Sequence, residues 1–243
     1  MDTEKAAIKA VAFDLYDTLV YRDRQFYRAA RRQMAKIAEV PYELFSQSWE
    51  NLAVESNMGI HLKTTSDRVT KILQKLNGRR DESVVQAIVK IEHEALRKHV
   101  HSFADVPTFL KRLERSPYKV VVVSNCSSSV QAVLQSPGLR IDDKPFMQYF
   151  DVIVLSYEVH VRKPNARIYQ IALDRVGMIP IECLYIGDDN DLELYGAFSA
   201  GMTTFSIQRP GHSYGGNTSS DPEYINYTIE SLEELGEFLP EID

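Results

Sequence analysis

The feature that most constrains the fold is a series of short apolar stretches, rich in β-branched residues, that alternate with segments of helical periodicity. Uninterrupted apolar runs of this length are typical of strands buried on both faces of a parallel sheet. The predicted strands cover 7–15, 118–125, 150–156, 183–188, 203–207 and, more weakly, 224–229. The helices predicted between them cover 107–116, 165–177 and 191–201. This alternation predicts right-handed βαβ units and a three-layer, Rossmann-like α/β core with a parallel sheet.

A long segment of different character separates the first two predicted strands. Four stretches in it have apolar residues at three- and four-residue spacing, which predicts amphipathic helices. They cover 22–40, 42–56, 66–78 and 82–100. We therefore expect an inserted all-helical cap over residues 21–102 and a core made of residues 1–20 and 103–243. Ligands bind at the carboxyl edge of open α/β sheets, and the cap follows that edge, so it should cover the site.

Composition narrows the classes of function. The chain has 243 residues, of which 44% are hydrophobic, and a net charge of −6. This predicts packed domains and argues against a general nucleic-acid binder, which needs a basic surface. Residues 1–10 lack the apolar run of a signal peptide, and no stretch has the length of a membrane span. Cys126 and Cys183 have no CxxC spacing, so we expect reduced, buried thiols and a cytoplasmic protein without a membrane partner. The oligomeric state stays open.

Polar side chains gather where the predicted strands end. They are Asp14 and Thr18, Ser124 and Asn125, Lys163, and Asp188, Asp189 and Glu193. Because the carboxyl ends of parallel strands share one edge of the sheet, we expect these segments to meet there. Carboxylates and a lysine are costly to bury without partners. Their chemistry predicts a site for an anionic group and for an oxygen-liganded cation such as Mg²⁺.

Four segments carry a family resemblance. FDLYDTL, VVSN, KPNARIYQIAL and IGDDNDLELYGAFSAGM, in this order and spacing, resemble the motifs of the haloacid dehalogenase-like (HAD) hydrolases. The resemblance covers residues 7–20 and 103–235, and the insert resembles the type-one cap of that family. Each motif alone is a weak signal, but four that agree are specific.

The resemblance implies roles in the reaction for four residues. Asp14 would be the nucleophile that forms a covalent aspartyl intermediate. Lys163 would keep Asp14 ionised and neutralise charge on the transferring group. Ser124, with the backbone around Asn125, would hydrogen-bond the phosphoryl oxygens of a small-molecule substrate.

The resemblance also implies a magnesium site. Asp188 would bind Mg²⁺ together with Asp14 and the backbone carbonyl of Tyr16, with Asp189 beside it, and the cation would screen carboxylates that otherwise repel. Thr18 would order the loop that carries these groups.

Tyr16 departs from the phosphatase pattern. In most phosphatases of the family, the residue two places after the nucleophile is an aspartate that protonates the leaving group and then activates water. Loss of a positioned general acid costs about 10²–10⁴ in rate for poor leaving groups. Strand alternation aims Asp17 elsewhere unless the loop curls. We therefore expect substrates whose leaving group needs no proton, such as acyl or aryl phosphates, anhydrides or carbon–halogen bonds.

Three functions stay open. The motif FDLYxTL resembles that of the L-2-haloacid dehalogenases, and Tyr169, six residues after Lys163, fits their pattern. Those enzymes are metal-independent and carry Ser and Asn where this chain has GDDND. We therefore favour a Mg²⁺-dependent phosphohydrolase over a dehalogenase that releases halide. The third hypothesis is a catalytically weak binding protein with the HAD fold.

Other residues have plainer expected roles. Asp191 and Glu193 suit the first turn of a helix, where carboxylates complement the dipole. We expect most of three arginines to form a solvated charge run and three aromatic residues to pack inside the cap. These are Arg22, Arg24 and Arg28, and Tyr27, Phe45 and Trp49. Segment 211–224 is turn-rich and should be a surface connection to a last helix at 231–239.

Overall fold

The computed structural model describes residues 7–211 and 223–242. Its core is a sheet of six parallel strands in the order β10-β9-β8-β1-β4-β7. The strands are β1 Ala10–Phe13, β4 Lys119–Ser124, β7 Val152–Leu155, β8 Cys183–Gly187, β9 Thr203–Ile207 and β10 Tyr227–Ile229. The predicted Rossmann-like α/β core is therefore confirmed.

Helices cover both faces of this sheet. Val11 and Phe13 of β1 pack into one hydrophobic layer with α6 (Val106–Arg115), whereas Ala10 and Ala12 pack into the opposite layer with α9 (Ala166–Val176) and α10 (Glu193–Ser199). Both faces of β1 are thus buried, which explains the uninterrupted apolar sequence. Burial of each large side chain in these layers contributes about 1.5–3 kcal/mol.

Shorter elements complete the core. They are α7 Val130–Leu134, α8 Ser156–Val159, β5 Arg140–Ile141, β6 Lys144–Pro145, and the 3₁₀ helices η1 Phe146–Tyr149, η2 Pro180–Glu182, η3 Asn190–Leu192 and η4 Leu232–Glu237. The last predicted helix, 231–239, is thus a shorter 3₁₀ helix. The predicted surface connection 211–224 lies almost wholly outside the described residues. Cys126 and Cys183 are buried and unpaired, as expected.

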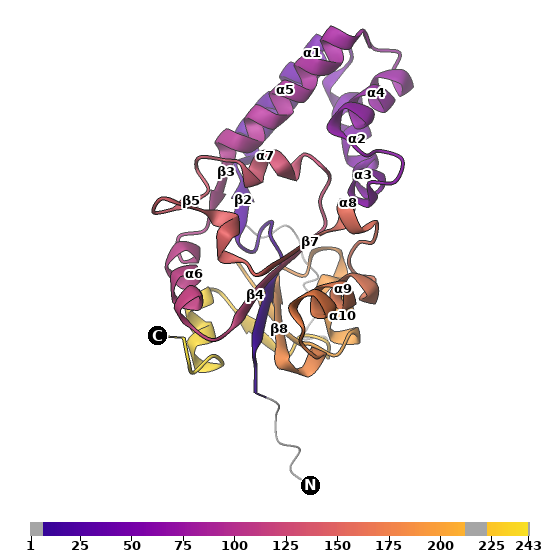
Figure 1. The fold of residues 1–243 in the computed structure, drawn as a ribbon. Coiled ribbons are helices and arrows are strands. Elements are labelled where there is room, and N and C mark those ends of the chain that lie inside the picture. The colour runs from indigo at the N-terminus through magenta and orange to yellow at the C-terminus, as the bar shows by residue number, and fades with distance from the viewer. Residues whose placement is uncertain (1–6, 212–222, 243) are drawn as a thin grey trace.

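Five helices form a separate body above the sheet (Figure 1). They are α1 Arg24–Ile37, α2 Tyr42–Asn51, α3 Ala53–Met58, α4 Thr65–Lys75 and α5 Glu82–His99. The predicted helix at 42–56 is split at Leu52, which gives five helices where four were expected. Side-chain caps start three of them, including the capping box of Thr64 and Asp67. Helices α1, α2, α4 and α5 share a hydrophobic cluster of their own, and all five helices lie within 21–102, which we propose as the cap.

The cap contacts the core along α5, which packs against α7, and at two further places. At one, β2 (Val20–Arg22) pairs antiparallel with β3 (Val100–Ser102), so the two chain crossings form one ribbon. At the other, α3 and its C-terminal turn lie on α8: the Ser156 hydroxyl donates to the Asn57 carbonyl at 2.7 Å. Gly59 has φ +61°, and a Cβ there would collide with the Tyr157 carbonyl oxygen. We call this second contact, residues 57–59 against 156–160, the cap latch.

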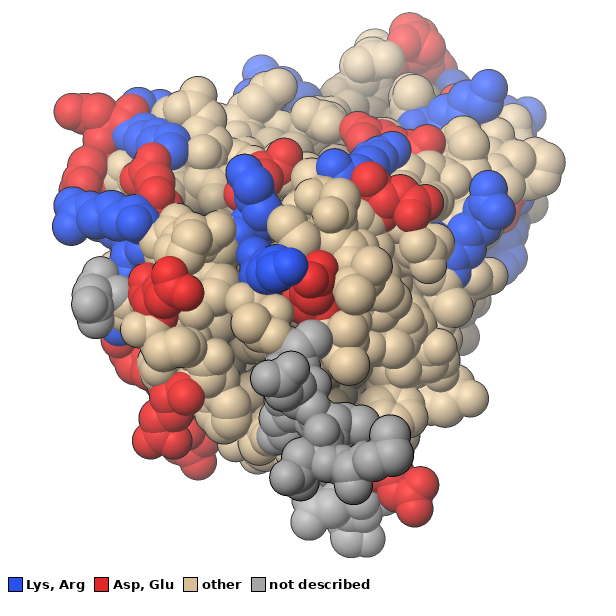
Figure 2. All heavy atoms as spheres, turned by 60° about the horizontal axis from the view of Figure 1, so that its bottom comes forward, with Lys and Arg blue, Asp and Glu red and all other residues tan. Residues whose placement is uncertain are grey.

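Surface charge on the core is mixed in sign. Figure 2 shows acidic and basic side chains interspersed with uncharged ones on the face seen when the bottom of Figure 1 comes forward. Among the described residues, no helix combines the length and apolar character needed to cross a bilayer.

Candidate active site

The loop after β1 curls back on itself. The Asp14 amide continues the sheet by donating to the Ile186 carbonyl at 2.9 Å, and the Leu15 carbonyl then accepts from the amide of Val20 at 2.9 Å. Asp17 has a left-handed backbone with φ +62°. The curl places Asp14, Tyr16 and Asp17 on the wall of one cavity of about 330 Å³. Strand alternation alone would have turned Asp17 away.

Lys163 lies at the centre of the buried charges. Its ammonium donates to Asp14 Oδ1 and to Glu193 Oε2, and to the Tyr185 hydroxyl at 3.0 Å. Burial alone would lower the pKa of Lys163, but the two carboxylates raise it above its ordinary value. Asn125 holds the lysine backbone, because its side chain accepts from the Lys163 amide at 2.8 Å and donates to its carbonyl at 3.1 Å. Asn125 thus positions Lys163.

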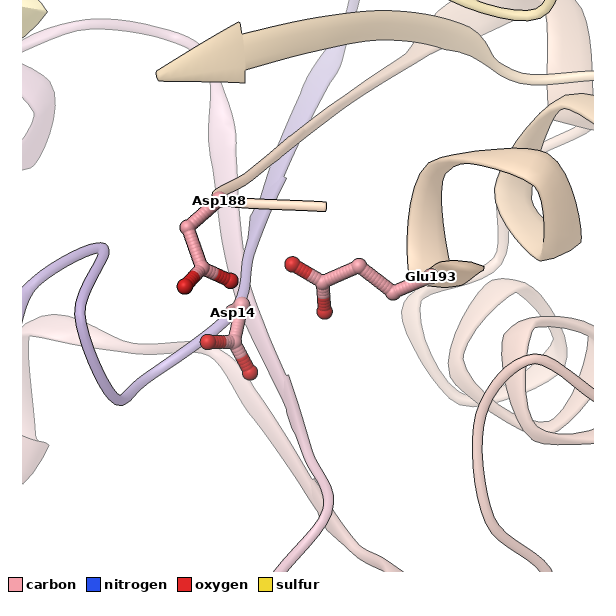
Figure 3. Close-up of side chains that lie close together, drawn as sticks. All are labelled: Asp14, Asp188 and Glu193. Atoms are coloured by element: carbon pink, nitrogen blue, oxygen red, sulfur yellow. The ribbon is translucent and has the colours of Figure 1, made fainter. Parts of the chain in front are cut away.

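Three carboxylates converge beside this lysine. Asp14 follows β1, Asp188 follows β8 and Glu193 begins α10, and each offers an oxygen within 4.8 Å of the others (Figure 3). Gly187 makes room for this arrangement, because a Cβ there would collide with the Glu193 carboxylate. Burial, followed by the charge of Asp14, raises the pKa of Asp188 to about 6 and raises that of Glu193 well above its ordinary range.

The donor set fits a hard divalent cation. All the offered atoms are carboxylate oxygens, as Mg²⁺ and Ca²⁺ prefer. The second oxygen of Glu193, Oε1, is buried and has no hydrogen-bond partner among the described residues. A cation between these groups would remove the repulsion that raises their pKa values.

The structure does not bring Asp189 into this group. Its Oδ1 accepts from the Leu194 amide at 3.2 Å and its Oδ2 accepts from the Tyr224 hydroxyl at 3.0 Å. Glu193 was expected at this edge of the sheet and as a helix-dipole residue, but not as a metal ligand, and it takes the place that the sequence suggested for Asp189. Asp191 pairs with Arg162 at 2.5 Å.

Tyr16 faces the cavity as a neutral group. The guanidinium carbon of Arg22 lies 4.9 Å from the centroid of its ring. Burial raises the pKa of the Tyr16 phenol above its ordinary value, so the proton stays on oxygen at neutral pH.

Ser124 and Thr18 are both fully buried. Each hydroxyl lacks a hydrogen-bond partner among the described residues, and beyond Ser124 the cavity wall is formed by Asn125, Cys126 and Ser127. Thr18 orders the loop through its backbone rather than its hydroxyl, since its carbonyl accepts two hydrogen bonds from Arg209 at 2.8 and 3.1 Å. Sequence reasoning missed Arg209, which no motif marks.

The sequence matches the haloacid dehalogenase-like hydrolases over residues 8–201. The chain belongs to this family. It is therefore a hydrolase, and the predicted resemblance is confirmed.

Individual family members resemble the chain over nearly its whole length. A glyceraldehyde 3-phosphate phosphatase of Methanopyrus kandleri is 26% identical over 238 residues, which cover 97% of this chain and 98% of that protein. A HAD phosphatase of Thermococcus onnurineus has a similar fold, with a TM-score of 0.66, 20% identity, and coverage of 96% and 99%. A 2-haloacid dehalogenase of Pseudomonas syringae has a TM-score of 0.70 and 22% identity, with coverage of 96% and 98%.

In this HAD hydrolase, the cap contributes more charge to the cavity than the sequence suggested. Arg22, Arg31, Arg68 and Glu92 all line it, as do Tyr27 and Trp49. Arg22 belongs to a run of three arginines, most of which were expected on a solvated surface. Phe45 and Trp49 both pack in the cap cluster, as expected, and Trp49 also lines the cavity, whereas Tyr27 packs against the core cluster. Arg31, Arg68 and Glu92 were not singled out, although each interrupts the apolar face of a predicted helix, and that interruption was the available signal.

Proposed function

We propose that the protein is a Mg²⁺-dependent phosphohydrolase that acts on a small phosphorylated metabolite through an aspartyl-phosphate intermediate. The observation that carries the proposal is the convergence of Asp14, Asp188 and Glu193 beside Lys163. Asp14, Asp188 and Glu193 would hold Mg²⁺, together with the Tyr16 carbonyl that the family resemblance implies. When bound, the cation would supply charge neutralisation for the phosphoryl group and the carboxylates.

The chain's own residues suit a phosphoryl transfer in two steps. Asp14 would attack phosphorus with one carboxylate oxygen, and the bond to the leaving oxygen would break. Lys163 lies against the same carboxylate, so it can keep Asp14 ionised and balance charge on the transferring group. Water would then attack the aspartyl phosphate, releasing phosphate and restoring Asp14. The neutral phenol of Tyr16 is a weak acid, so it suits good leaving groups such as acyl and aryl phosphates. A poorer leaving group would depend on Asp17, which the curl places on the cavity wall and whose pKa burial raises to about 7.

Several sequence relatives are named phosphatases, whereas one from Burkholderia cepacia is named an (S)-2-haloacid dehalogenase. The Methanopyrus kandleri relative, matched over nearly its full length, is named a glyceraldehyde 3-phosphate phosphatase. Glyceraldehyde 3-phosphate is therefore a substrate to test. The cavity volume of about 330 Å³ suits a metabolite of that size class.

A dehalogenase is the second candidate. Tyr16 in the first motif supports it, and so does Tyr169, whose buried hydroxyl donates to the Glu193 carbonyl at 2.6 Å. The acid cluster argues against it, because a metal-independent site gains nothing from three carboxylates that repel one another.

One set of assays separates the candidates. The purified protein is given p-nitrophenyl phosphate, acetyl phosphate, glyceraldehyde 3-phosphate and L-2-chloropropionate, each with Mg²⁺ and with EDTA. We expect phosphate release that EDTA abolishes. Chloride release that EDTA leaves unchanged would overturn the proposal in favour of a dehalogenase, and absence of turnover on all four would favour a binding protein.

The nucleophile has a direct test. Asp14→Asn removes the attacking oxygen while keeping the size of the side chain, so turnover should fall by about 10⁴-fold or more. Asp142→Asn is the matched control, because Asp142 is an exposed core acid paired with Lys111 and does not line the cavity. Phosphate release by Asp14→Asn at the control rate would exclude the aspartyl intermediate.

A further inference from the structure

The cap wall of the cavity holds charges that are buried but incompletely paired. Arg31 of α1, Arg68 of α4 and Glu92 of α5 are only 8%, 6% and 4% exposed. Both guanidinium carbons lie 4.4 Å from the ring centroid of Trp49, so one aromatic ring supports two cations. Three separate helices thus deliver charged groups to one place opposite Asp14.

These side chains line the cavity, and part of each is buried in the cap wall without a hydrogen-bond partner among the described residues. Arg31 Nε, Arg68 Nε and Glu92 Oε2 are buried without a hydrogen-bond partner among the described residues, and all three residues line the cavity. The contacts that they do make use other atoms, such as Arg68 Nη2 to the Trp49 carbonyl. Buried polar groups in proteins are nearly always paired. The two arginines that line the cavity are therefore not fully hydrogen-bonded within the cap.

The cap end of the cavity carries excess positive charge. Arg22 lines it together with Arg31 and Arg68, against the two carboxylates of Glu50 and Glu92. The Glu50 side chain is 71% exposed, so water screens it. Burial lowers the pKa of Arg68 to about 10, which still leaves it charged at neutral pH.

A second hollow adjoins this end. Its volume is about 430 Å³, and Arg22, Tyr27, Arg31 and Glu50 line both spaces. Arg24 and Arg28 add two more cations to the second hollow. An anion that approaches from this side meets positive charge before it reaches the catalytic acids, which favours entry of anionic molecules.

We propose that Arg31 and Arg68 bind a second oxyanion of the substrate, a carboxylate or a phosphate, while the reacting phosphoryl group lies at Asp14. This inference rests on the proposed function and narrows it to small phosphomonoesters with an anionic group at the far end. Guanidinium groups suit this task because their N–H groups match the oxygens of carboxylate and phosphate. Phosphomonoesters with an uncharged far end lack the group that the cap wall binds.

Binding of phosphonates tests the inference without turnover. Isothermal titration in Mg²⁺ compares n-propylphosphonate with 3-phosphonopropionate and propane-1,3-bisphosphonate, which add a carboxylate or a second phosphonate. We expect at least one of the two probes with a second anionic group to bind about tenfold tighter than n-propylphosphonate, or more. The probe that binds more tightly identifies the preferred oxyanion. Equal affinity for all three probes would overturn the inference.

Arginine variants separate recognition from packing. Arg68→Gln should abolish the affinity advantage that a second anionic group gives over n-propylphosphonate. Arg31→Gln provides the same test if Arg68→Gln does not fold. Arg32→Gln is the matched control, since Arg32 is the next residue of α1, is exposed and lines neither hollow. An advantage that persists in both cavity variants, or equal weakening of all probes, would show a structural role and overturn the inference.

The two proposals fail in different ways. Equal kcat/KM for phosphate esters with an uncharged and with an anionic far end would contradict the second oxyanion site but not the phosphohydrolase activity. Selective binding of a phosphonate with a second anionic group, without hydrolysis of any phosphate ester, would contradict the phosphohydrolase activity but not the oxyanion site.

Discussion

On the core wall of the cavity a lysine binds two carboxylates, whereas on the cap wall two arginines lie against one aromatic ring. Lys163 bonds to Asp14, Glu193 and Tyr185, and Asn125 holds its backbone from behind. The guanidiniums of Arg31 and Arg68 rest on Trp49 instead, with buried N–H groups unpaired among the described residues. The core wall is therefore held by its own ion pairs, although Glu193 Oε1 lacks a partner among the described residues, whereas the arginines of the cap wall are held mainly by an aromatic ring.

The difference between the two walls matches two tasks, because the core wall carries the reacting groups and the cap wall carries groups for substrate recognition. Reacting groups must be held closely in place, and strand ends joined by several hydrogen bonds provide that rigidity. Recognition groups must be free to exchange water for a ligand, so they sit on helix faces with donors to spare.

Tyr16 tests whether the core wall lacks only an acid. Tyr16→Asp places a carboxyl two residues after the nucleophile, and turnover of alkyl phosphates should rise by about 10²-fold, while acetyl phosphate changes little. Steady-state kinetics with both substrates measure this. Tyr16→Phe is the control and should not gain activity on alkyl phosphates. A Tyr16→Asp variant without that gain would show that acid catalysis is not what limits the wild type.

Glu193 and Asp189 form a matched pair for the metal site. Glu193→Gln removes a carboxylate from the cluster, so the Mg²⁺ concentration for half-maximal turnover should rise by about 10–100-fold. Asp189→Asn should leave it nearly unchanged, because Asp189 bonds to Leu194 and Tyr224 instead. Magnesium titrations of both variants decide the matter, and the reverse order of effects would reassign the third ligand to Asp189.

A variant in the cap latch tests whether activity requires the cap wall to be held against the core wall. Gly59→Ala forces a Cβ against the Tyr157 carbonyl and should separate α3 from α8, lowering kcat/KM by about tenfold. Gly177→Ala controls for backbone strain, since Gly177 also has positive φ but no atom within 4 Å of its added Cβ. Equal loss of kcat/KM in the two variants would mean that strain, and not the latch, causes it.

Asp105 tests the support behind the core wall. Burial opposes its ionisation, but hydrogen bonds from Arg209 and the Leu232 amide outweigh it and hold the pKa of Asp105 below its ordinary 3.8. Its stabilisation is therefore complete above the unfolded value and is lost as the pH falls through the folded one. Asp105→Asn should lower the free energy of unfolding by about 1 kcal/mol at pH 7, with a smaller penalty near pH 3. Urea unfolding at both pH values measures it, and a penalty that does not shrink in acid would contradict the assignment.

Sequence patterns suffice where the sheet itself fixes positions. Asp14, Ser124 and Asp188 directly end or follow parallel strands, so their placement at one edge is a consequence of strand order. The sequence suggested Asp189 as the third carboxylate of the cluster, and the presence of Glu193 there instead has a different origin. Asp191 and Leu192 both have positive φ, which redirects the chain before α10, and a leucine gives no warning of that conformation.

The cap wall was beyond prediction for another reason. Arg31, Arg68 and Glu92 lie on three helices whose meeting depends on how the cap packs, and pattern alone shows only that each falls on an apolar face. The curl that turns Asp17 toward the cavity is likewise set by backbone hydrogen bonds, such as that from the Asp17 amide to the Val20 carbonyl at 2.6 Å.

The Ser156 hydroxyl has a consequence for the timing of substrate exchange. It donates to Asn57 across the cap latch and also accepts from the amide of Cys126, a residue of the cavity wall, at 3.0 Å. Movement of α3 away from the core breaks the first bond, and the same hydroxyl can then donate to the Cys126 carbonyl, which lies 3.2 Å away. The segment after β4 therefore shares one hydrogen-bonding group with the cap, and any substrate exchange that moves α3 must break the bond between Ser156 and Asn57.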